Sequence, residues 1–286
     1  MPKLIRFSDF FQSDKLFGLI GHQFTASKIL KLKNKFLYQS YRLFKILAIF
    51  IAISFMMNSY VLSNELIDVV ESFACGVIMC MTLIRVLYVI HYKRDKIKNV
   101  IQKLERHFPL TVHEQKLYGC SGYLGIVKSM CSTTVVLNAT LWMHNSLLPF
   151  TLQLFALING ESREWEGILK LYYPFDKMEP LAFWTTWIFE TWLIFILLFL
   201  LGTTDFIFGE LSAVVSMELR IVGKQIESID SGNDDAADEL KRLVDIHQEL
   251  LDIVAEIGKI FSPILFINLL SMVLTMGCCA FVVVRT

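Results

Sequence analysis

Long apolar stretches alternate with polar segments along this chain of 286 residues. Each stretch is close to or above the roughly 20 residues that an α-helix needs to cross a bilayer. This pattern predicts an all-α fold, a polytopic membrane protein built as a bundle of helices. The five apolar stretches cover residues 44–62, 72–90, 130–157, 180–201 and 260–284.

Lys and Arg residues fall mainly into alternate gaps between these stretches. Residues 1–45 hold nine of them, residues 91–128 hold eight and residues 203–259 hold five. The gap at 63–71 holds none, and the gap at 158–179 holds three against five acidic residues. Because cationic loops stay in the cytoplasm, we expect the N-terminus inside and, after five crossings, the C-terminus outside. A G-protein-coupled receptor has the opposite orientation.

The same pattern divides the chain into four predicted regions. Residues 1–45 form a cytosolic N-terminal segment. Residues 46–201 contain the first four spans, with an extracellular loop at 158–179. Residues 202–259 form a cytosolic helical hairpin, and residues 260–284 form the fifth span.

Two of the polar regions carry apolar residues at helical spacing. In the hairpin, turn-forming residues at 230–234 separate helical patterns at 211–229 and 240–257. The apolar stripe of the second pattern is too long to leave in water, so we expect it to pack against another part of the protein. Residues 4–20 also show helical spacing. They fit two alternatives, an amphipathic helix in the membrane interface or a cytosolic helix packed on the inner ends of the spans.

Composition supports a membrane protein and argues against several other classes. The chain is 55% hydrophobic with a mean hydropathy of +0.53, too apolar for a soluble domain of this length. None of its six cysteines lies in a predicted extracellular loop, so we expect no disulfide framework and no metal site. Metalloprotease, phosphate-loop and serine-hydrolase motifs are absent, so we expect no enzyme and no cofactor. The basic loops fit lipid headgroups and not nucleic acid.

The third predicted span carries a stripe of polar residues on one helical face. Its members are Thr134, Asn138, Trp142, Asn145, Pro149 and Gln153, which follow one another at intervals of three or four residues. Polar groups at this depth cost several kcal/mol when they face lipid unpaired, so the stripe is expected to face the interior. Two interpretations remain open, hydrogen bonds that join helices and a ligand pocket.

The fourth predicted span combines aromatic residues with a carboxylate. Phe183, Thr186, Trp187 and Glu190 share one helical face, and Trp184 lies beside it. An ionised carboxylate near mid-span is costly and indicates a functional site. Glu190 is therefore expected to be protonated or paired, with His144 or Asn138 as candidate donors.

Several residue patterns, taken in order, resemble those of one membrane protein family. The approach to the fourth span has the sequence Tyr172-Tyr173-Pro174-Phe175-Asp176, followed by Pro180. The second hairpin helix holds Leu243, His247 and Leu250-Leu251, and the fifth span follows with Phe261-Ser262-Pro263, Ser271 and Cys278. This succession is similar to that of insect odorant receptors, which carry a Tyr-Pro-Phe-Asp-like loop and a Leu…His…Leu-Leu helix at these places.

The resemblance implies a subunit of an odorant-gated cation channel. Such a subunit binds a small volatile ligand, works with a common odorant co-receptor as a hetero-oligomer, and lies in the cell membrane of an olfactory neuron dendrite. The ligand pocket of the family lies in the outer half of the helix bundle, beneath a loop that acts as a lid. Carried onto this sequence, the pocket residues are Phe73, Val77, Met143, Asn145, Ser146, Phe150, Phe183, Trp187 and Glu190, and the lid residues are Tyr172, Tyr173, Pro174, Phe175 and Asp176.

The resemblance also leaves differences and alternatives. Members of the family have seven spans and this chain shows five, so we expect an incomplete receptor that lacks the pore-lining helix. A gustatory-type receptor shares the inverted topology. A secondary transporter would show Gly- or Pro-interrupted spans in two related halves, whereas a membrane protein without a signalling role would not account for Glu190.

Overall fold

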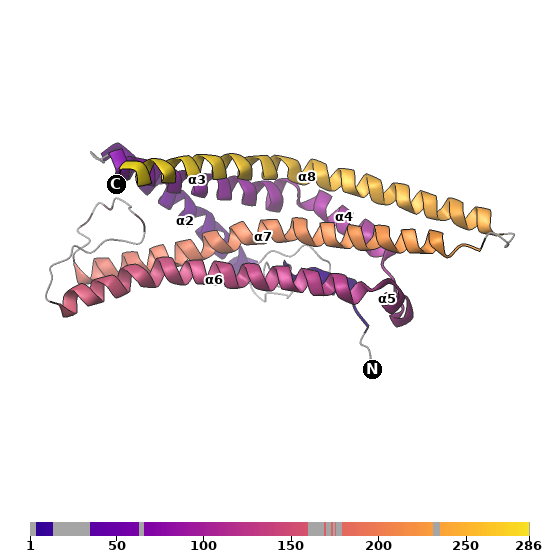
Figure 1. Cartoon of the computed structure of the whole chain (residues 1–286). Helices are drawn as coiled ribbons and strands as arrows, with labels where there is room; N and C mark the ends of the chain where they lie inside the picture. The colour runs from indigo at the N-terminus through magenta and orange to yellow at the C-terminus, as the bar shows by residue number, and fades with distance from the viewer. Residues whose placement is uncertain are drawn as a thin grey trace. The chain divides into compact units, whose positions relative to one another are not determined.

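Helices make up the whole regular structure of the part of the chain that can be described. The computed structural model describes residues 4–13, 35–62, 66–159, 169, 173, 175, 179–230 and 235–285. Over these residues it contains no strand, as the apolar pattern predicts. The elements are η1 (Phe7–Phe10), α2 (Lys35–Leu62), α3 (Leu66–Leu87), η2 (Tyr88–Tyr92), α4 (Arg94–His107), α5 (Val112–Tyr118), α6 (Cys120–Ile158), α7 (Pro180–Glu227) and α8 (Ala236–Arg285) (Figure 1).

The five predicted spans all fall within helices. Within the described residues, three helical segments are long and apolar enough to cross a membrane, namely Cys120–Ala156, Leu181–Glu227 and Ala236–Val284, and two shorter apolar helices occupy Ile46–Asn58 and Ser72–Leu87. At a rise of about 1.5 Å per residue, a helix of 48 residues such as α7 is roughly 70 Å long, more than twice the thickness of a bilayer core. The longest helices therefore each combine an apolar part with a more polar part.

The chain forms two compact units. The first unit comprises Met1–Lys31, Tyr88–Thr133 and Thr203–Ile264, and the second comprises Leu32–Leu87, Thr134–Gly202 and Leu265–Thr286. The helices α6, α7 and α8 contribute to both units.

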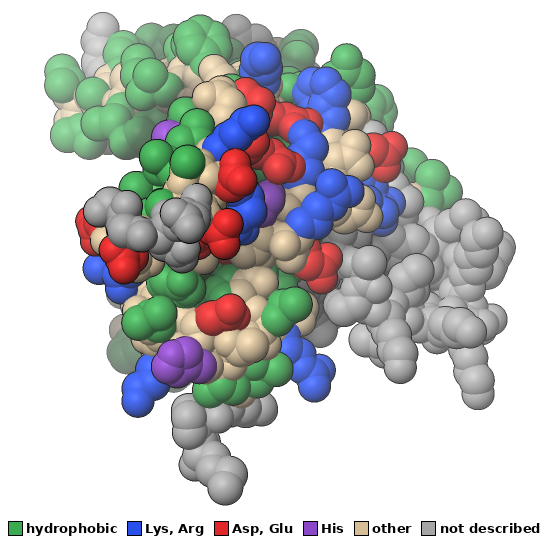
Figure 2. All heavy atoms as spheres, turned by 90° about the vertical axis from the view of Figure 1, so that its right-hand side faces the viewer, with side chains coloured by type: hydrophobic (Ala, Val, Ile, Leu, Met, Phe, Trp, Pro, Cys, Tyr) green, Lys and Arg blue, Asp and Glu red, His purple; other side chains and the backbone are tan. Residues whose placement is uncertain are grey.

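The first unit has an apolar core and a charged surface. Ile97, Val100 and Leu104 of α4 are fully buried, and Phe208 of α7 contacts Phe261 of α8 at 5.3 Å between ring centroids. Ion pairs join α4 to α8, with Lys103 3.0 Å from Glu256 and His107 3.2 Å from Glu249. Figure 2 shows basic and acidic side chains gathered on one face. A surface rich in charged side chains of both signs is typical of a region in contact with water.

The N-terminal segment packs into this first unit. Phe7, Phe10 and Phe11 are buried, and the rings of Phe7 and Phe10 meet Phe108 at 5.5 and 5.8 Å. Gln115 of α5 ties the backbone of Ile5 with two hydrogen bonds, of 2.9 and 2.8 Å. Within residues 4–13, Phe7–Phe10 thus form a short 3₁₀ turn packed on the first unit. The cytosolic placement of the segment stays a prediction. Residues 14–20 lie outside the described residues.

A carboxylate of α7 anchors the same N-terminal segment. The backbone N–H of Ser13 donates to Oε1 of Glu210 at 2.7 Å, and the Ser13 hydroxyl donates to Oε2. Both residues are buried. Because both carboxylate oxygens accept, the pair holds the end of the segment in a fixed place.

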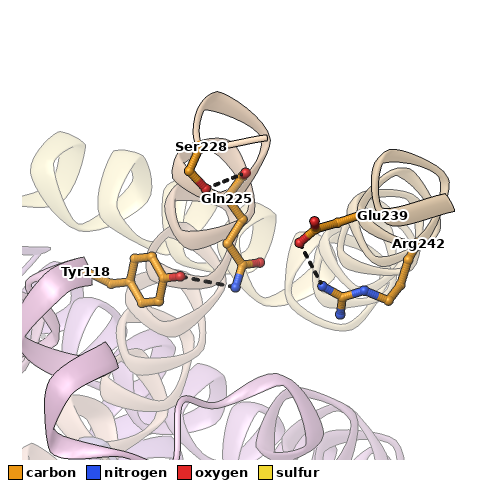
Figure 3. Close-up of polar contacts among 5 residues, drawn as sticks. All are labelled: Tyr118, Gln225, Ser228, Glu239 and Arg242. Atoms are coloured by element: carbon orange, nitrogen blue, oxygen red, sulfur yellow. Dashed lines mark hydrogen bonds and ion pairs between the residues drawn. The ribbon is translucent and has the colours of Figure 1, made fainter. Parts of the chain in front are cut away.

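The predicted helix–turn–helix is observed, since α7 ends at Glu227 and α8 begins at Ala236. Figure 3 shows the polar contacts near this turn. Gln225 donates from its side chain to the Tyr118 hydroxyl at 3.3 Å, and its backbone carbonyl accepts from Ser228 at 2.8 Å. The first bond ties the end of α7 to α5, and the second lies within the end of α7. The remaining turn residues, 231–234, lie outside the described residues.

Glu218, a buried carboxylic acid of the first unit, predicts how the stability of the protein depends on pH. Glu218 of α7 is 1% exposed, and its Oε1 has no hydrogen-bond partner among the described residues. It lies roughly 25 Å along the helix beyond Leu201, the end of the predicted span. Burial raises the pKa of its carboxyl from 4.5 to about 8. Glu218 also lies close enough to Cys120 to add to the rise in that thiol's pKa, which burial takes to about 11.

The folded state therefore holds the Glu218 proton more tightly than the unfolded chain does. Between pH 4.5 and about 8, unfolding releases this proton, so the free energy of unfolding falls as the pH rises. We expect Glu218→Gln, which stays neutral, to remove this dependence and to stabilise the protein on the order of 4 kcal/mol at and above pH 8. Thermal unfolding in detergent across this pH range measures the effect. The exposed Glu227→Gln is the matched control, and equal pH slopes in the two variants would contradict the prediction.

Candidate functional site

A pocket of about 530 Å³ lies within the second unit. Its volume falls inside the range of roughly 300–1,000 Å³ that is typical of small-molecule sites. In Figure 1, α3 and the C-terminal part of α8 run side by side, and the pocket lies between them and α2. The lining residues are Met56 of α2, Ser72, Ala74, Cys75 and Ile78 of α3, Leu169, and Thr275, Cys278, Cys279, Val282 and Val283 of α8.

The chemistry of this pocket is apolar with a few polar groups. Aliphatic side chains and three thiols form most of the wall. Ser72 is 5% exposed, and the Thr275 hydroxyl donates to the carbonyl of Ser271 at 2.8 Å. Among the described residues, no cluster of His, Cys, Asp and Glu is placed to hold a metal ion. The wall suits a small, mainly apolar molecule.

Leu169 connects this pocket to the buried carboxylate of α7. Its side chain lines the pocket, while its backbone N–H donates to Oε2 of Glu190 at 3.0 Å. The Tyr173 hydroxyl donates to Oε1 of the same carboxylate at 2.7 Å. Glu190 is completely buried and Tyr173 is 8% exposed. The carboxylate therefore holds two points of the loop that precedes α7.

The buried contact with Glu190 also affects the pKa of Tyr173. Burial, with a further contribution from the Glu190 carboxylate, holds the pKa of the Tyr173 hydroxyl well above its usual range. The hydroxyl therefore keeps its proton and remains a donor to Glu190 at physiological pH. The prediction that Glu190 pairs with His144 or Asn138 is wrong. His144 is exposed, and the Asn138 amide donates to the Leu198 carbonyl at 3.2 Å.

Aromatic rings gather where α6 meets α7, in the second unit. Phe150 of α6 lies 5.9 Å from Trp184 and 5.8 Å from Trp187, and Phe183 lies 5.5 Å from Trp184. The buried Ser146 hydroxyl and the Trp187 indole nitrogen have no hydrogen-bond partner among the described residues. The structure thus brings together Phe150, Phe183 and Trp187 of the predicted pocket residues.

The other predicted pocket residues occupy different places. Met143 is 50% exposed, and the exposed Asn145 donates to the Leu141 carbonyl of its own helix at 2.7 Å. Phe73 is 49% exposed. Val77 is half-buried on α3, one position before the lining residue Ile78. Of the predicted lid, Tyr173 contacts Phe175 at 5.3 Å between ring centroids, and Tyr172, Pro174 and Asp176 lie outside the described residues.

The polar stripe of α6 joins helices along part of its length. Besides the Asn138 bond, the Trp142 indole donates to the Thr191 carbonyl of α7 at 3.0 Å. Gly202 of α7 makes this approach possible, because a Cβ there would lie 2.6 Å from Nδ2 of Asn138. The side chains of Pro149 and Gln153 lie outside the described residues.

Sequence reasoning missed the α8 wall of the pocket. Thr275, Cys278, Cys279 and Val282 follow one another at positions i, i+3, i+4 and i+7 and so share one helical face. Ser72 and Cys75 share a face of α3 in the same way. Two such faces with hydroxyl and thiol groups in apolar spans are the signal that could have located the pocket.

Comparison with known proteins places this fold. No curated protein sequence matches the chain significantly. The structure of the insect olfactory receptor OR5 from Machilis hrabei matches with a TM-score of 0.77 and 16% identity, over 94% of this chain and 69% of that one. The structure of the same receptor in complex with eugenol gives 0.78 and 15%, over 97% and 71%. At such identities the likeness establishes the fold.

Family membership comes from the sequence. A sequence model described as 7tm Odorant receptor matches residues 65–286, most of the chain. The observed helices, their apolar spans and the shared fold agree with this match. The chain belongs to the 7tm odorant receptor family.

Proposed function

We propose that this odorant receptor binds a small volatile ligand in the pocket between α3 and α8, and gates a cation current together with a common co-receptor. The observation that carries the proposal is the pocket of about 530 Å³ with a largely apolar wall, in a chain that belongs to the odorant receptor family. The Machilis hrabei receptor, similar in fold, was determined with eugenol, a small volatile molecule. A ligand of that class suits the present wall.

The physical basis of binding is the transfer of apolar surface out of water. Each Å² of apolar surface removed from water contributes roughly 25 cal/mol, and small ligands gain between about 0.3 and 1.5 kcal/mol per non-hydrogen atom. A ligand with about a dozen such atoms is therefore expected to bind in the micromolar range. Ser72 and Thr275 give hydroxyls that can orient one polar group of the ligand.

The link from pocket to loop supplies a route by which binding could reach the rest of the receptor. Leu169 belongs to the wall, and its backbone is held by Glu190. A ligand that displaces Leu169 would strain this bond and the neighbouring Tyr173–Glu190 bond. The two bonds of Glu190, to Leu169 and to Tyr173, are the contacts that such a ligand would bias.

The orientation proposed is that of the sequence analysis, with the N-terminus and the helical hairpin in the cytosol. The charges of the first unit and the face in Figure 2 support an aqueous surrounding for that unit. The exposed apolar side chains of the second unit, such as Leu137 at 58% and Phe266 at 66%, support lipid contact. The nine pocket residues that the family resemblance implies on α3, α6 and α7 stay a prediction of the ligand pocket.

Filling the pocket tests the proposal. Ala74 lines the pocket and is 9% exposed, so Ala74→Phe would occupy space that the ligand needs. We expect the variant to lose at least about tenfold in affinity, because each 1.4 kcal/mol of lost contact is one factor of ten. The measurement is the shift in unfolding temperature that eugenol produces in the purified protein.

Leu137→Phe, on the exposed face of α6, is the matched control and should keep the shift of the wild type. Unfolding without ligand shows whether Ala74→Phe is folded. An equal shift in the folded Ala74→Phe variant would contradict a ligand site between α3 and α8.

A further inference from the structure

The pocket is unusual in its sulfur content. Cys75, Cys278 and Cys279 are three of its eleven lining residues, and the chain holds only six cysteines. All three are thiols and not disulfide sulfurs. Cys75 comes from α3 and the other two from α8, so the thiols lie on two walls of one apolar cavity.

We propose that this pocket captures small soft electrophiles, apolar α,β-unsaturated carbonyl compounds, by addition to its thiols. This inference rests on the proposed ligand site and names a class of ligand for it. Thiols are the strongest nucleophiles among ordinary side chains, and they add to polarised double bonds once a fraction of them is ionised. Cys279 is the most exposed of the three, so a ligand can reach its sulfur.

The addition needs no further reactant. The sulfur of Cys279, Cys278 or Cys75 forms a bond to the β-carbon of the ligand, and the π bond between its α- and β-carbons breaks. The thiol proton goes to water, and the enolate then takes a proton from water at its α-carbon. Atoms and charge balance, no oxidant or reductant is consumed and nothing leaves the ligand.

The apolar wall accounts for selectivity. An enone partitions into the cavity beside the thiols, and holding two reactants together raises their effective concentration strongly. A charged electrophile gains no binding energy from the same apolar wall. The vicinal pair Cys278–Cys279 lies one turn from Thr275 on the same helix face, so a hydroxyl and two thiols share this wall.

The cysteines outside the pocket provide internal controls. Cys80 and Cys131 are half-buried, as Cys75 and Cys278 are, and do not line the pocket. A difference in reactivity between the pocket thiols Cys75 and Cys278 and these two controls therefore reports the pocket and not general exposure.

The test treats the purified full chain in detergent with 1-octen-3-one and locates adducts by peptide mass mapping over time. We expect Cys75 and Cys278 to react at least about tenfold faster than Cys80 and Cys131, because the wall concentrates the enone. Excess 3-octanone, the saturated ketone of the same size, should slow the pocket thiols alone. Cys278→Ser, Cys279→Ser and the double variant should lose the α8 adducts in turn.

Equal rates at Cys75, Cys278, Cys80 and Cys131, or no protection by 3-octanone, would overturn the inference. The protection of the pocket thiols by 3-octanone and the shift of unfolding temperature produced by eugenol are two separate measurements. If eugenol still stabilises the protein while the pocket thiols react no faster than the controls, covalent capture fails and the ligand site stands. If eugenol gives no shift but the pocket thiols react fast and are protected by 3-octanone, capture stands and the site is not one for eugenol.

Discussion

Replacing Glu190 by Ala is expected to lower the free energy of unfolding by roughly 2–4 kcal/mol. The substitution leaves the Tyr173 hydroxyl and the Leu169 N–H, which now donate at 2.7 and 3.0 Å, without their acceptor. Each buried donor left unsatisfied costs about 1–3 kcal/mol. Thermal unfolding of the purified protein in detergent, followed by tryptophan fluorescence, measures the loss.

A double-mutant cycle separates this contact from general damage. Tyr173→Phe alone should cost about 1–2 kcal/mol. The combined variant should cost less than the sum of the two, by about 1 kcal/mol, because the two side chains share one hydrogen bond. Glu239→Ala is the control, since its exposed carboxylate lies 4.0 Å from Arg242 and such pairs contribute little. Strict additivity of Glu190→Ala and Tyr173→Phe would contradict the assigned contact.

Gly202→Ala is expected to destabilise the protein by roughly 2–4 kcal/mol. The added Cβ would lie 2.6 Å from Nδ2 of Asn138 and 3.5 Å from Cγ2 of Thr134. Asn138 would have to turn away and give up its part-buried hydrogen bond to the Leu198 carbonyl, so this contact between α6 and α7 would be lost. The measurement is the same thermal unfolding.

The chain offers a matched control for this substitution. A Cβ at Gly76 of α3 meets nothing within 4 Å, so Gly76→Ala should be neutral or stabilising by up to about 1 kcal/mol through helix propensity. In a protein that already carries Asn138→Ala, the further change Gly202→Ala should cost much less than it does in the wild type, since the atom that clashes is gone. Similar losses for Gly202→Ala and Gly76→Ala would rule out the close approach.

The helices were predictable because membrane crossing leaves a strong signal. The stretch at 180–201 is apolar on all sides, so it could be identified as a span without knowledge of its neighbours. Its helix in fact continues to Glu227, since Leu211, Val214 and Val215 keep the helical spacing and are buried in the first unit. By contrast, the first part of the helical pattern over residues 4–20 contains a 3₁₀ turn at Phe7–Phe10, where Phe7 and Phe10 pack on Phe108.

The candidate site was predictable in part. Glu190 was recognised because a carboxylate in an apolar span demands a partner. Its partner Tyr173 was assigned to the loop, but no sequence rule brings that loop back onto mid-span. The α8 wall depends on which helices are neighbours, and one sequence does not contain that information. The same holds for the bonds of Asn138 and Trp142 to α7.

The family match also decides between the receptor classes that the sequence left open. The loop with Tyr173 and Phe175 and the helix with His247 favoured an odorant over a gustatory-type receptor, and the family model agrees. The family match does not identify the ligand. The proposed class of ligand follows from the thiols and hydroxyls that line the pocket and not from the family.

The most direct test of the central claim is the current recorded from cells that express this chain together with the odorant co-receptor, over a panel of volatile compounds. The account predicts that at least one small volatile evokes a cation current absent from cells with the co-receptor alone, and that Ala74→Phe, present at the cell surface, raises the concentration needed at least about tenfold. Responses identical to those of the co-receptor alone, with this chain at the surface, would contradict it.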